Sequence, residues 1–337
     1  MHDKSVQLKL LAAFAAIYGI WGSTFIAIKY AVEAIPPFLM MGIRSLAAGL
    51  ILYLWSRWRG DEKAKGEHVI PLVIIGTLFF LVGHGLLAWG QQKAPSGLAA
   101  LLCASQPLWI ATIESFMVKD HKATPKTVFG LVIGFLGISL LFAPWEKLGN
   151  HHVDSLSAFA ILLGALSWSG GAVYSRVAKL PKSPFLSAGL ELIIGGFLLL
   201  ACGLLMGEGN QLRLHELPLH SLLGLLYLII FGSVITFTAY IWLLSITSAT
   251  RVGTHSYVNP VIAVFLGWAI AGEALSLQIF MATIIIVISV YLILGRKREK
   301  VSPNLSPRFI RNIENRNTKQ ERSTLVSFFK FHQKPHL

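Results

Sequence analysis

Long apolar stretches alternate with short polar links along most of the chain. Each stretch is close to the roughly 20 residues that a helix needs to cross a bilayer core about 30 Å thick. Because backbone groups in lipid must satisfy one another, each stretch is expected to be a helix, and none shows the alternation of barrel strands. The pattern predicts an all-α integral membrane protein. Its ten transmembrane helices are expected at Leu8–Tyr30, Pro37–Trp55, Val69–Trp89, Ser96–Val118, Lys126–Ala143, Leu156–Ser175, Phe185–Met206, Leu219–Leu243, Ala249–Ala271 and Leu277–Leu294.

The composition agrees with this pattern. Of the 337 residues, 54% are hydrophobic and 13% are charged. An ordinary soluble domain carries about 25% charged residues. A chain with half that share lacks the polar groups to cover its own surface, which excludes a soluble globular protein.

The basic residues predict the orientation of the helices. With the N-terminus inside, 24 of the 29 Lys and Arg residues fall on cytoplasmic segments, three on outer loops and two within the spans. Cytoplasmic loops are enriched in Lys and Arg, so we expect both termini on the cytoplasmic side of the membrane. Residues 295–337 carry eleven basic and three acidic residues and predict a disordered tail beside the membrane. The net charge of +13 therefore indicates orientation, and no nucleic-acid partner is expected.

Other chemistry finds little support in the sequence. Both cysteines lie within predicted spans, which excludes a disulfide framework, and no P-loop spacing occurs. His151, His152 and Asp154 are possible metal ligands without a second cluster, so we expect no metal and no cofactor.

The two halves of the chain resemble each other. When Trp21 is placed on Trp168, Arg44 falls on Glu191. Five helices per half is an odd number, so the repeats at residues 1–145 and 156–294 are expected to have inverted topology. Such repeats let transporters expose a central site to either side of the membrane.

A second offset aligns the dipeptide Gln106-Pro107 with Asn259-Pro260. Each proline removes a backbone hydrogen bond and is expected to break its helix. One interpretation is that Gln106 and Asn259 line a central cavity beside these breaks. The alternative is a pair of packed kinks without ligand contact.

Two charged residues lie well inside predicted spans, where a charge costs about 2.5–3.5 kcal/mol. Inversion places Arg44 and Glu191 at different depths, so we expect each to meet other partners rather than form a direct salt bridge. Arg44 could hold a substrate carboxylate, and Glu191 a cationic group or a coupling proton. Structural hydrogen bonding is the alternative for both.

Four further residues are candidates for the cavity. His84 lies between two glycines that let another helix approach closely, and it is either a proton relay, a ligand contact or a structural histidine. Trp21 and Tyr257 are candidates for an aromatic wall, with ordinary aromatic packing as the alternative. Ser23 completes the predicted set.

These residues match a known family. The run Trp21-Gly22-Ser23-Thr24-Phe25, followed by Pro36-Pro37 and Arg44, resembles the first helices of the EamA family of the drug/metabolite transporter superfamily. Asn259-Pro260 followed by Gly272-Glu273 is similar to its helix-nine signature, and Ser167-Trp168 through Gly207-Glu208 resembles its YedA-like inner-membrane exporters. The family implies ten helices, two five-helix repeats, both termini on the cytoplasmic side of a bacterial inner (plasma) membrane, and export of small metabolites or drugs. Where it commonly has Gly-Glu after helix four, this chain has Lys119-Asp120.

The sequence therefore predicts a secondary transporter, not an enzyme, that exports small metabolites, amino acids or drugs by alternating access. Its expected partners are a small solute and the lipid bilayer, with protons as a candidate coupling ion and a homodimer as a candidate assembly. Import or exchange by the same fold is the first alternative. An intramembrane enzyme using Ser23 and His84, or a receptor or scaffold, are the others.

Overall fold

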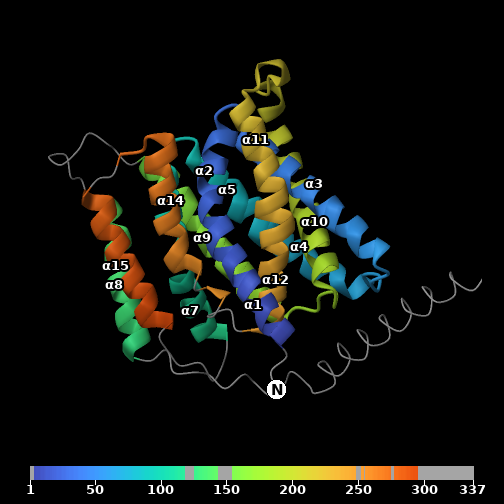
Figure 1. Ribbon diagram of the computed structural model, residues 1–337, viewed down its shortest axis with the longest axis horizontal. Coiled ribbons are helices and arrows are strands. Elements are labelled where there is room, and N and C mark those ends of the chain that lie inside the picture. The colour runs from blue at the N-terminus through green and yellow to red at the C-terminus, as the bar shows by residue number, and fades with distance from the viewer. Residues whose placement is uncertain are drawn as a thin grey trace, which may run out of the picture. The chain divides into compact units, whose positions relative to one another are not determined.

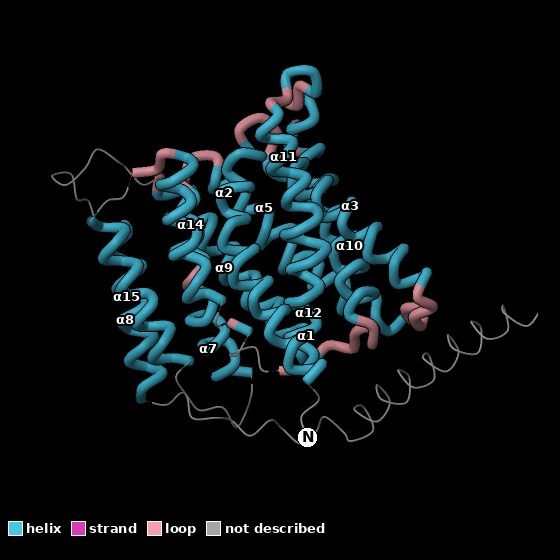
Figure 2. Tube along the Cα trace, in the orientation of Figure 1, coloured by secondary structure: helices cyan, strands magenta, loops and turns pink. Residues whose placement is uncertain are grey.

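The computed structural model describes residues 4–117, 125–142, 154–247, 252–253, 255–274 and 277–294. Within these ranges every regular element is helical, and Figure 2 shows no strand. The prediction of an all-α protein is confirmed. The predicted tail, Asp120, His151 and His152 lie outside the described residues.

Each of the first five predicted stretches coincides with helix. Several of these helices contain a π-helical or 3-10 turn, labelled η. The elements are α1 (Lys4–Ala15), η1 (Ala16–Ile20), α2 (Trp21–Val32), α3 (Pro37–Trp58), η2 (Gly66–His68), α4 (Val69–Gly76), η3 (Thr77–His84), α5 (Gly85–Gln91), α6 (Ser96–Cys103), α7 (Gln106–Met117) and α8 (Pro125–Phe142).

The second half of the chain is helical as well. Its elements are α9 (Ser155–Val177), α10 (Pro184–Leu205), η4 (Glu208–Asn210), η5 (Leu214–Glu216), α11 (Leu219–Tyr227), η6 (Leu228–Ile235), α12 (Thr236–Ile246), α14 (His255–Ala271) and α15 (Leu277–Leu294). Figure 1 shows α8 and α15 side by side at one edge of the helical body, next to α7 and α14.

Seven helical segments of the described chain are long and apolar enough to cross a membrane. They coincide with the first four predicted stretches and with the sixth, seventh and eighth. The fifth, ninth and tenth stretches contain the shorter apolar helices Val128–Gly137, Val258–Ala271 and Ile279–Ser289. A total of ten spans remains a prediction.

The second and seventh segments, α3 and α10, pack antiparallel at close range. Glycines make this approach possible. A Cβ atom on Gly49 would lie 2.8 Å from the backbone nitrogen of Ile193, and one on Gly196 would lie 2.7 Å from that of Leu46. Small residues at such contacts let membrane helices gain van der Waals contact along their backbones. A Cβ atom on Gly42 would lie 3.0 Å from the backbone nitrogen of Leu200, so Arg44 lies on α3 between the close contacts at Gly42 and Leu46.

Acidic side chains cap the starts of neighbouring helices. Glu208, which follows α10, accepts hydrogen bonds from the backbone N–H groups of Phe38 and Leu39 in the first turn of α3 at 3.2 and 2.8 Å. At the opposite end of the same pair, Asp61 follows α3 and accepts a hydrogen bond from Ser183, the residue before α10. Orphan N–H groups and the positive end of a helix dipole favour a carboxylate at this position.

The outer faces of the helices are apolar. Large hydrophobic side chains stay exposed along α3, α9, α10, α11, α14 and α15, with Leu54 at 64%, Phe159 at 62% and Phe265 at 58% exposure. Exposed apolar surface of this extent marks contact with a partner or a membrane. Together with the length of the helices, it shows a protein that passes the membrane several times.

Candidate substrate cavity

A cavity lies among helices from both halves of the chain. It encloses about 660 Å³ between atoms, including its open mouth. The described residues that line it come from α2, α3, η3, α5, α6, α7, α9 and α14 and from the link after α6. They are Trp21, Thr24, Phe25, Ile28, Arg44, Gly83, His84, Leu87, Ala100, Cys103, Ala104, Gln106, Gly164, Ala165, Trp168, His255, Ser256, Asn259 and Pro260. Five of the eight predicted cavity residues are in this set: Trp21, Arg44, His84, Gln106 and Asn259.

Among the described lining residues, Arg44 is the one that carries a formal charge. Its side chain is buried, with 2% of the residue exposed. Nε donates to the hydroxyl of Ser233 in η6 at 2.8 Å, and Nη1 donates to the sulfur of Met41 at 3.4 Å. No described carboxylate pairs with it, and the expected absence of a direct bridge to Glu191 agrees with the contacts of both residues. A guanidinium has five N–H groups, so most of the Arg44 donors have no protein acceptor among the described residues.

Aromatic rings form one side of the cavity. Trp21 and Trp168 meet edge to face with centroids 5.9 Å apart, and both contact Tyr240 behind them. The His84 ring lies over Trp168 with centroids 4.9 Å apart. The resulting wall is apolar on its faces and polar at the imidazole.

Glycines bring the wall together, as expected from the sequence around His84. A Cβ atom on Gly164 would lie 2.8 Å from the Gly83 carbonyl oxygen, and one on Gly83 would lie 3.6 Å from that of Gly164. The backbones of η3 and α9 therefore pass each other directly at the cavity.

Three π-helical stretches, η1, η3 and η6, are a feature that the sequence did not predict. In each, a backbone carbonyl accepts a hydrogen bond from a side chain of another element. Trp21 Nε1 donates to the Gly232 carbonyl in η6 at 3.2 Å, and Ser167 Oγ donates to the Leu78 carbonyl in η3 at 2.8 Å. With its amide nitrogen facing the backbone, Asn259 donates to the Ile17 and Tyr18 carbonyls in η1 at 3.2 and 3.0 Å.

These bonds change the interpretation of two predicted residues. The indole N–H of Trp21 and the amide of Asn259 hold π-helical backbone in place, and both residues also face the cavity. Short π-helical segments within α-helices occur frequently at functional sites. The amide of Gln106 differs, because its side chain has no partner in the described part of the chain.

The two prolines affect their helices differently. Pro107 cannot donate to the carbonyl of Cys103, where α6 ends, and α7 begins at Gln106. Pro260 lies inside α14, which continues past it, so the prediction of a helix break there is wrong. The Asn259 amide also donates to the His255 carbonyl at 3.3 Å. A side chain thus bonds to the backbone of α14 within the turn before Pro260.

Glu191 and Ser23 are not part of the described lining. Glu191 on α10 is fully buried, and one carboxyl oxygen accepts a hydrogen bond from Ser187 at 2.8 Å while the other has no partner. Ser23 donates to the Ile20 carbonyl and contacts the Tyr227 hydroxyl at 2.6 Å. The side chain of Tyr257 lies outside the described residues.

His255 and Ser256 line the cavity and were not among the predicted residues. His255 precedes Asn259 by four positions, which places both on one face of α14. That spacing was the available signal. The Nδ1 atom of His255 lies 2.8 Å from the Val252 carbonyl, whereas the Ser256 hydroxyl has no described partner.

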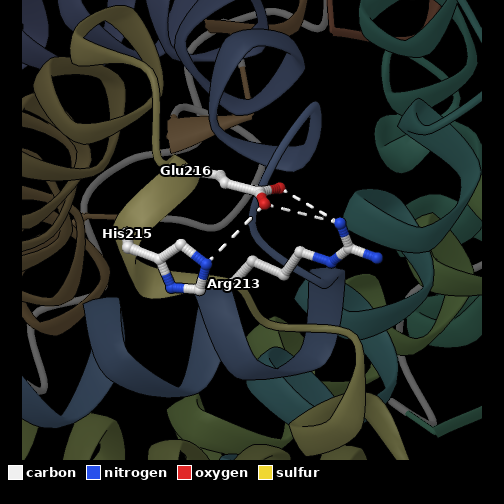
Figure 3. Close-up of polar contacts among 3 residues, drawn as sticks. All are labelled: Arg213, His215 and Glu216. Atoms are coloured by element: carbon white, nitrogen blue, oxygen red, sulfur yellow. Dashed lines mark hydrogen bonds and ion pairs between the residues drawn. The ribbon is translucent and has the colours of Figure 1, made fainter.

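Another polar cluster lies at the surface. Figure 3 shows Glu216 between Arg213 and His215, with Nη1 of Arg213 at 3.2 Å and Nε2 of His215 at 3.7 Å. All three side chains are more than half exposed. Asp154 caps α9 by accepting from Ser157 N–H at 2.8 Å. Exposed pairs of this kind contribute little to the stability of the fold.

Comparison with known proteins decides the family. The EamA-like transporter family matches this chain twice, over residues 8–143 and 155–295. The chain belongs to the EamA-like transporter family. Two matches in one chain support an architecture of two repeats.

EamA relatives extend over most of the chain. The inner membrane transporter YedA of Escherichia coli strain K12, itself described as uncharacterized, is 34% identical over 304 residues, which cover 89% of this chain and 95% of YedA. The uncharacterized transporter YoaV of Bacillus subtilis strain 168 is 25% identical and covers 85% of this chain and 97% of its own. This protein is therefore a membrane transporter of the drug/metabolite transporter superfamily.

A solved crystal structure has the same fold as this EamA protein. The superposition has a TM-score of 0.61 at 21% identity and covers 85% of this chain and 96% of the other. At that identity the likeness concerns the fold alone.

Proposed function

We propose that this EamA protein is a secondary transporter that exports small metabolites, amino acids or drugs by alternating access. The observation that carries the proposal is the cavity, which takes its lining from both family matches. A site between two halves that rock against each other is how inverted-repeat transporters move solute. The solute gradient or proton exchange would supply the energy.

Helix packing supports two inverted five-helix repeats at residues 1–145 and 156–294. Under inversion, each helix and its counterpart should make equivalent contacts. The second segment packs on the seventh (α3 on α10), the fourth on the ninth (α6 on α14) and the fifth on the tenth (α8 on α15). The caps follow the same rule, because Asp61 after α3 binds the start of α10 while Glu208 after α10 binds the start of α3.

Ion pairs support the proposed topology. Arg176 pairs with Glu114 at 2.9 Å, and both belong to the proposed cytoplasmic side. Lys93 pairs with Asp154 at 3.7 Å on the proposed outer side. A chain with the wrong number of spans between these residues would place the partners on opposite faces. With both termini on the cytoplasmic side of an inner membrane, the basic tail would lie beside anionic lipid.

The hydrogen bonds of Ser23 favour transport over the enzyme alternative. A nucleophile must lie within hydrogen-bond reach of its base. Ser23 is bonded to Ile20 and Tyr227, and His84 Nδ1 has no partner among the described residues. The proposal also includes Glu191 as the carrier of a coupling proton and a homodimer as the assembly.

Flux across vesicles tests the proposal. Purified protein in sealed liposomes should release labelled solutes from a panel of amino acids and small organic acids faster than protein-free liposomes do. Asn259→Ala should lower this flux while the protein still inserts, because η1 loses its partner from α14. Absence of flux for the whole panel, together with turnover of a lipid, would contradict transport.

A further inference from the structure

We propose that the cavity selects small organic monoanions, with a carboxylate on Arg44 and a flat apolar body against Trp21 and Trp168. This inference names the substrate class and rests on the proposed transport function.

The charge of the lining carries the first step. In the described lining, Arg44 is the residue with a formal charge, and no Asp or Glu is present. A buried charge is tolerated when a counter-charge or hydrogen bonds satisfy it. The described chain offers Arg44 one hydroxyl and one thioether. A bound anion would supply the missing acceptor.

The orientation of the guanidinium carries the second step. The bonds from Nε to Ser233 and from Nη1 to Met41 fix the group and use two of its five N–H donors, which leaves one N–H of Nη1 and both of Nη2 for a ligand. Two parallel N–H donors match the two oxygens of a carboxylate. Gly232 provides the space, because a Cβ atom there would lie 3.1 Å from Nη2.

The rest of the lining describes the body of the ligand. Trp21 and Trp168 give the lining aromatic surface, and small or apolar side chains such as Ala100 and Leu87 complete it. Unpartnered polar atoms on His84 and Ser256 could meet one further polar group.

The same lining disfavours an ammonium group. A zwitterionic amino acid would bring its cation into a lining whose described residues contain no carboxylate. Burying a charge without a partner is costly, so the anion should bind more tightly than the zwitterion of the same shape. Charge, rather than shape, should therefore set the preference.

Four probes of one shape test this by titration calorimetry on the purified full-length protein in detergent. They are 3-phenylpropionate, its neutral amide, the zwitterion phenylalanine and the cation 3-phenylpropylamine. The anion should bind about ten- to a hundredfold more tightly than the amide, the range expected for hydrogen bonds to a charged group. Arg44→Gln should reduce the affinity for the anion to that for the amide and leave the amide unchanged. Arg213→Gln, an exposed arginine, should preserve the preference.

A second variant, Ser233→Ala, tests the inference if Arg44→Gln fails to fold. It keeps the charge and releases the Nε bond, so it should weaken anion binding several-fold with little effect on the amide. Equal binding of anion and amide, tighter binding of the amine, survival of the preference in Arg44→Gln, or no binding of any probe would each overturn the inference. Flux in liposomes separates the two proposals. Transport without anion preference would contradict only the inference, and Arg44-dependent binding without any flux would contradict the transport function.

Discussion

Two arginines in this protein have opposite surroundings. Arg213 lies in the loop before α11, its side chain is 71% exposed, and it pairs with Glu216 three positions away. Arg44 is 2% exposed and meets a hydroxyl and a thioether, with no carboxylate among the described residues. The accessible arginine thus has an ion pair, and the buried arginine has none within the described ranges.

This difference separates a charge that the fold tolerates from one that needs an explanation. An exposed ion pair contributes about 0.2–1 kcal/mol and can be lost without consequence. A buried ion costs several kcal/mol unless it is paired. Stability therefore does not account for Arg44, whereas a ligand that supplies the missing acceptor does.

The largest expected effect comes from replacing each arginine with methionine. Arg44→Met should lower flux by about ten- to a hundredfold, since it removes the charged donors. It should leave the midpoint of thermal unfolding of the ligand-free protein unchanged or higher, because the cost of the buried charge disappears. Arg213→Met should change the free energy of unfolding by less than about 0.5 kcal/mol and preserve flux. Flux assays and thermal unfolding of the purified variants check both.

One outcome would break the comparison. If Arg44→Met lowered the unfolding free energy by more than about 2 kcal/mol, Arg44 would be a structural residue whose hydrogen bonds outweigh its burial. The contrast with Arg213 would then concern stability and not ligand binding.

A third arginine gives an intermediate case. Arg176 on α9 pairs with Glu114 on α7 at 2.9 Å, and their side chains are 38% and 9% exposed. Arg176→Gln should cost about 1–2 kcal/mol of unfolding free energy, between the values for exposed and fully buried pairs. Glu114→Gln in the same chain should restore part of that loss. Urea or thermal unfolding of the two single variants and the double variant measures the coupling, and strictly additive losses would show that the pair does not interact.

The apolar pattern predicted the helices because a backbone in lipid has few other options. All ten predicted stretches coincide with helix in the described chain, and the link residues fall between helices. The repeat indicated Trp21, Arg44, Gln106 and Asn259, which the fold brings to one cavity. Depth along the helices also predicted that Arg44 and Glu191 do not pair.

Tertiary contacts decided what the sequence did not predict. The π-helical stretches accept hydrogen bonds from Trp21, Ser167 and Asn259, which belong to distant segments, so no local pattern shows them. Pro260 was expected to break its helix, as Pro107 does, but α14 continues past it. No pattern in the sequence shows which neighbours Glu191 and Ser23 face.

The smallest expected effect concerns the exposed end of α9. Hydrogen bonding of Asp154 with Ser157 lowers the pKa of the Asp154 carboxyl from its usual value of 3.8, with a smaller contribution from Lys93. A carboxyl with a lowered pKa stabilises the fold at higher pH and loses that contribution as pH falls through its folded-state pKa. Wild-type protein should therefore lose slightly more thermal stability than Asp154→Asn when pH falls from 5 to below 3.8, because asparagine caps the helix without titrating. Equal losses in thermal unfolding would show that Asp154 stabilises α9 only as a hydrogen-bond acceptor and that its exposed charge contributes nothing.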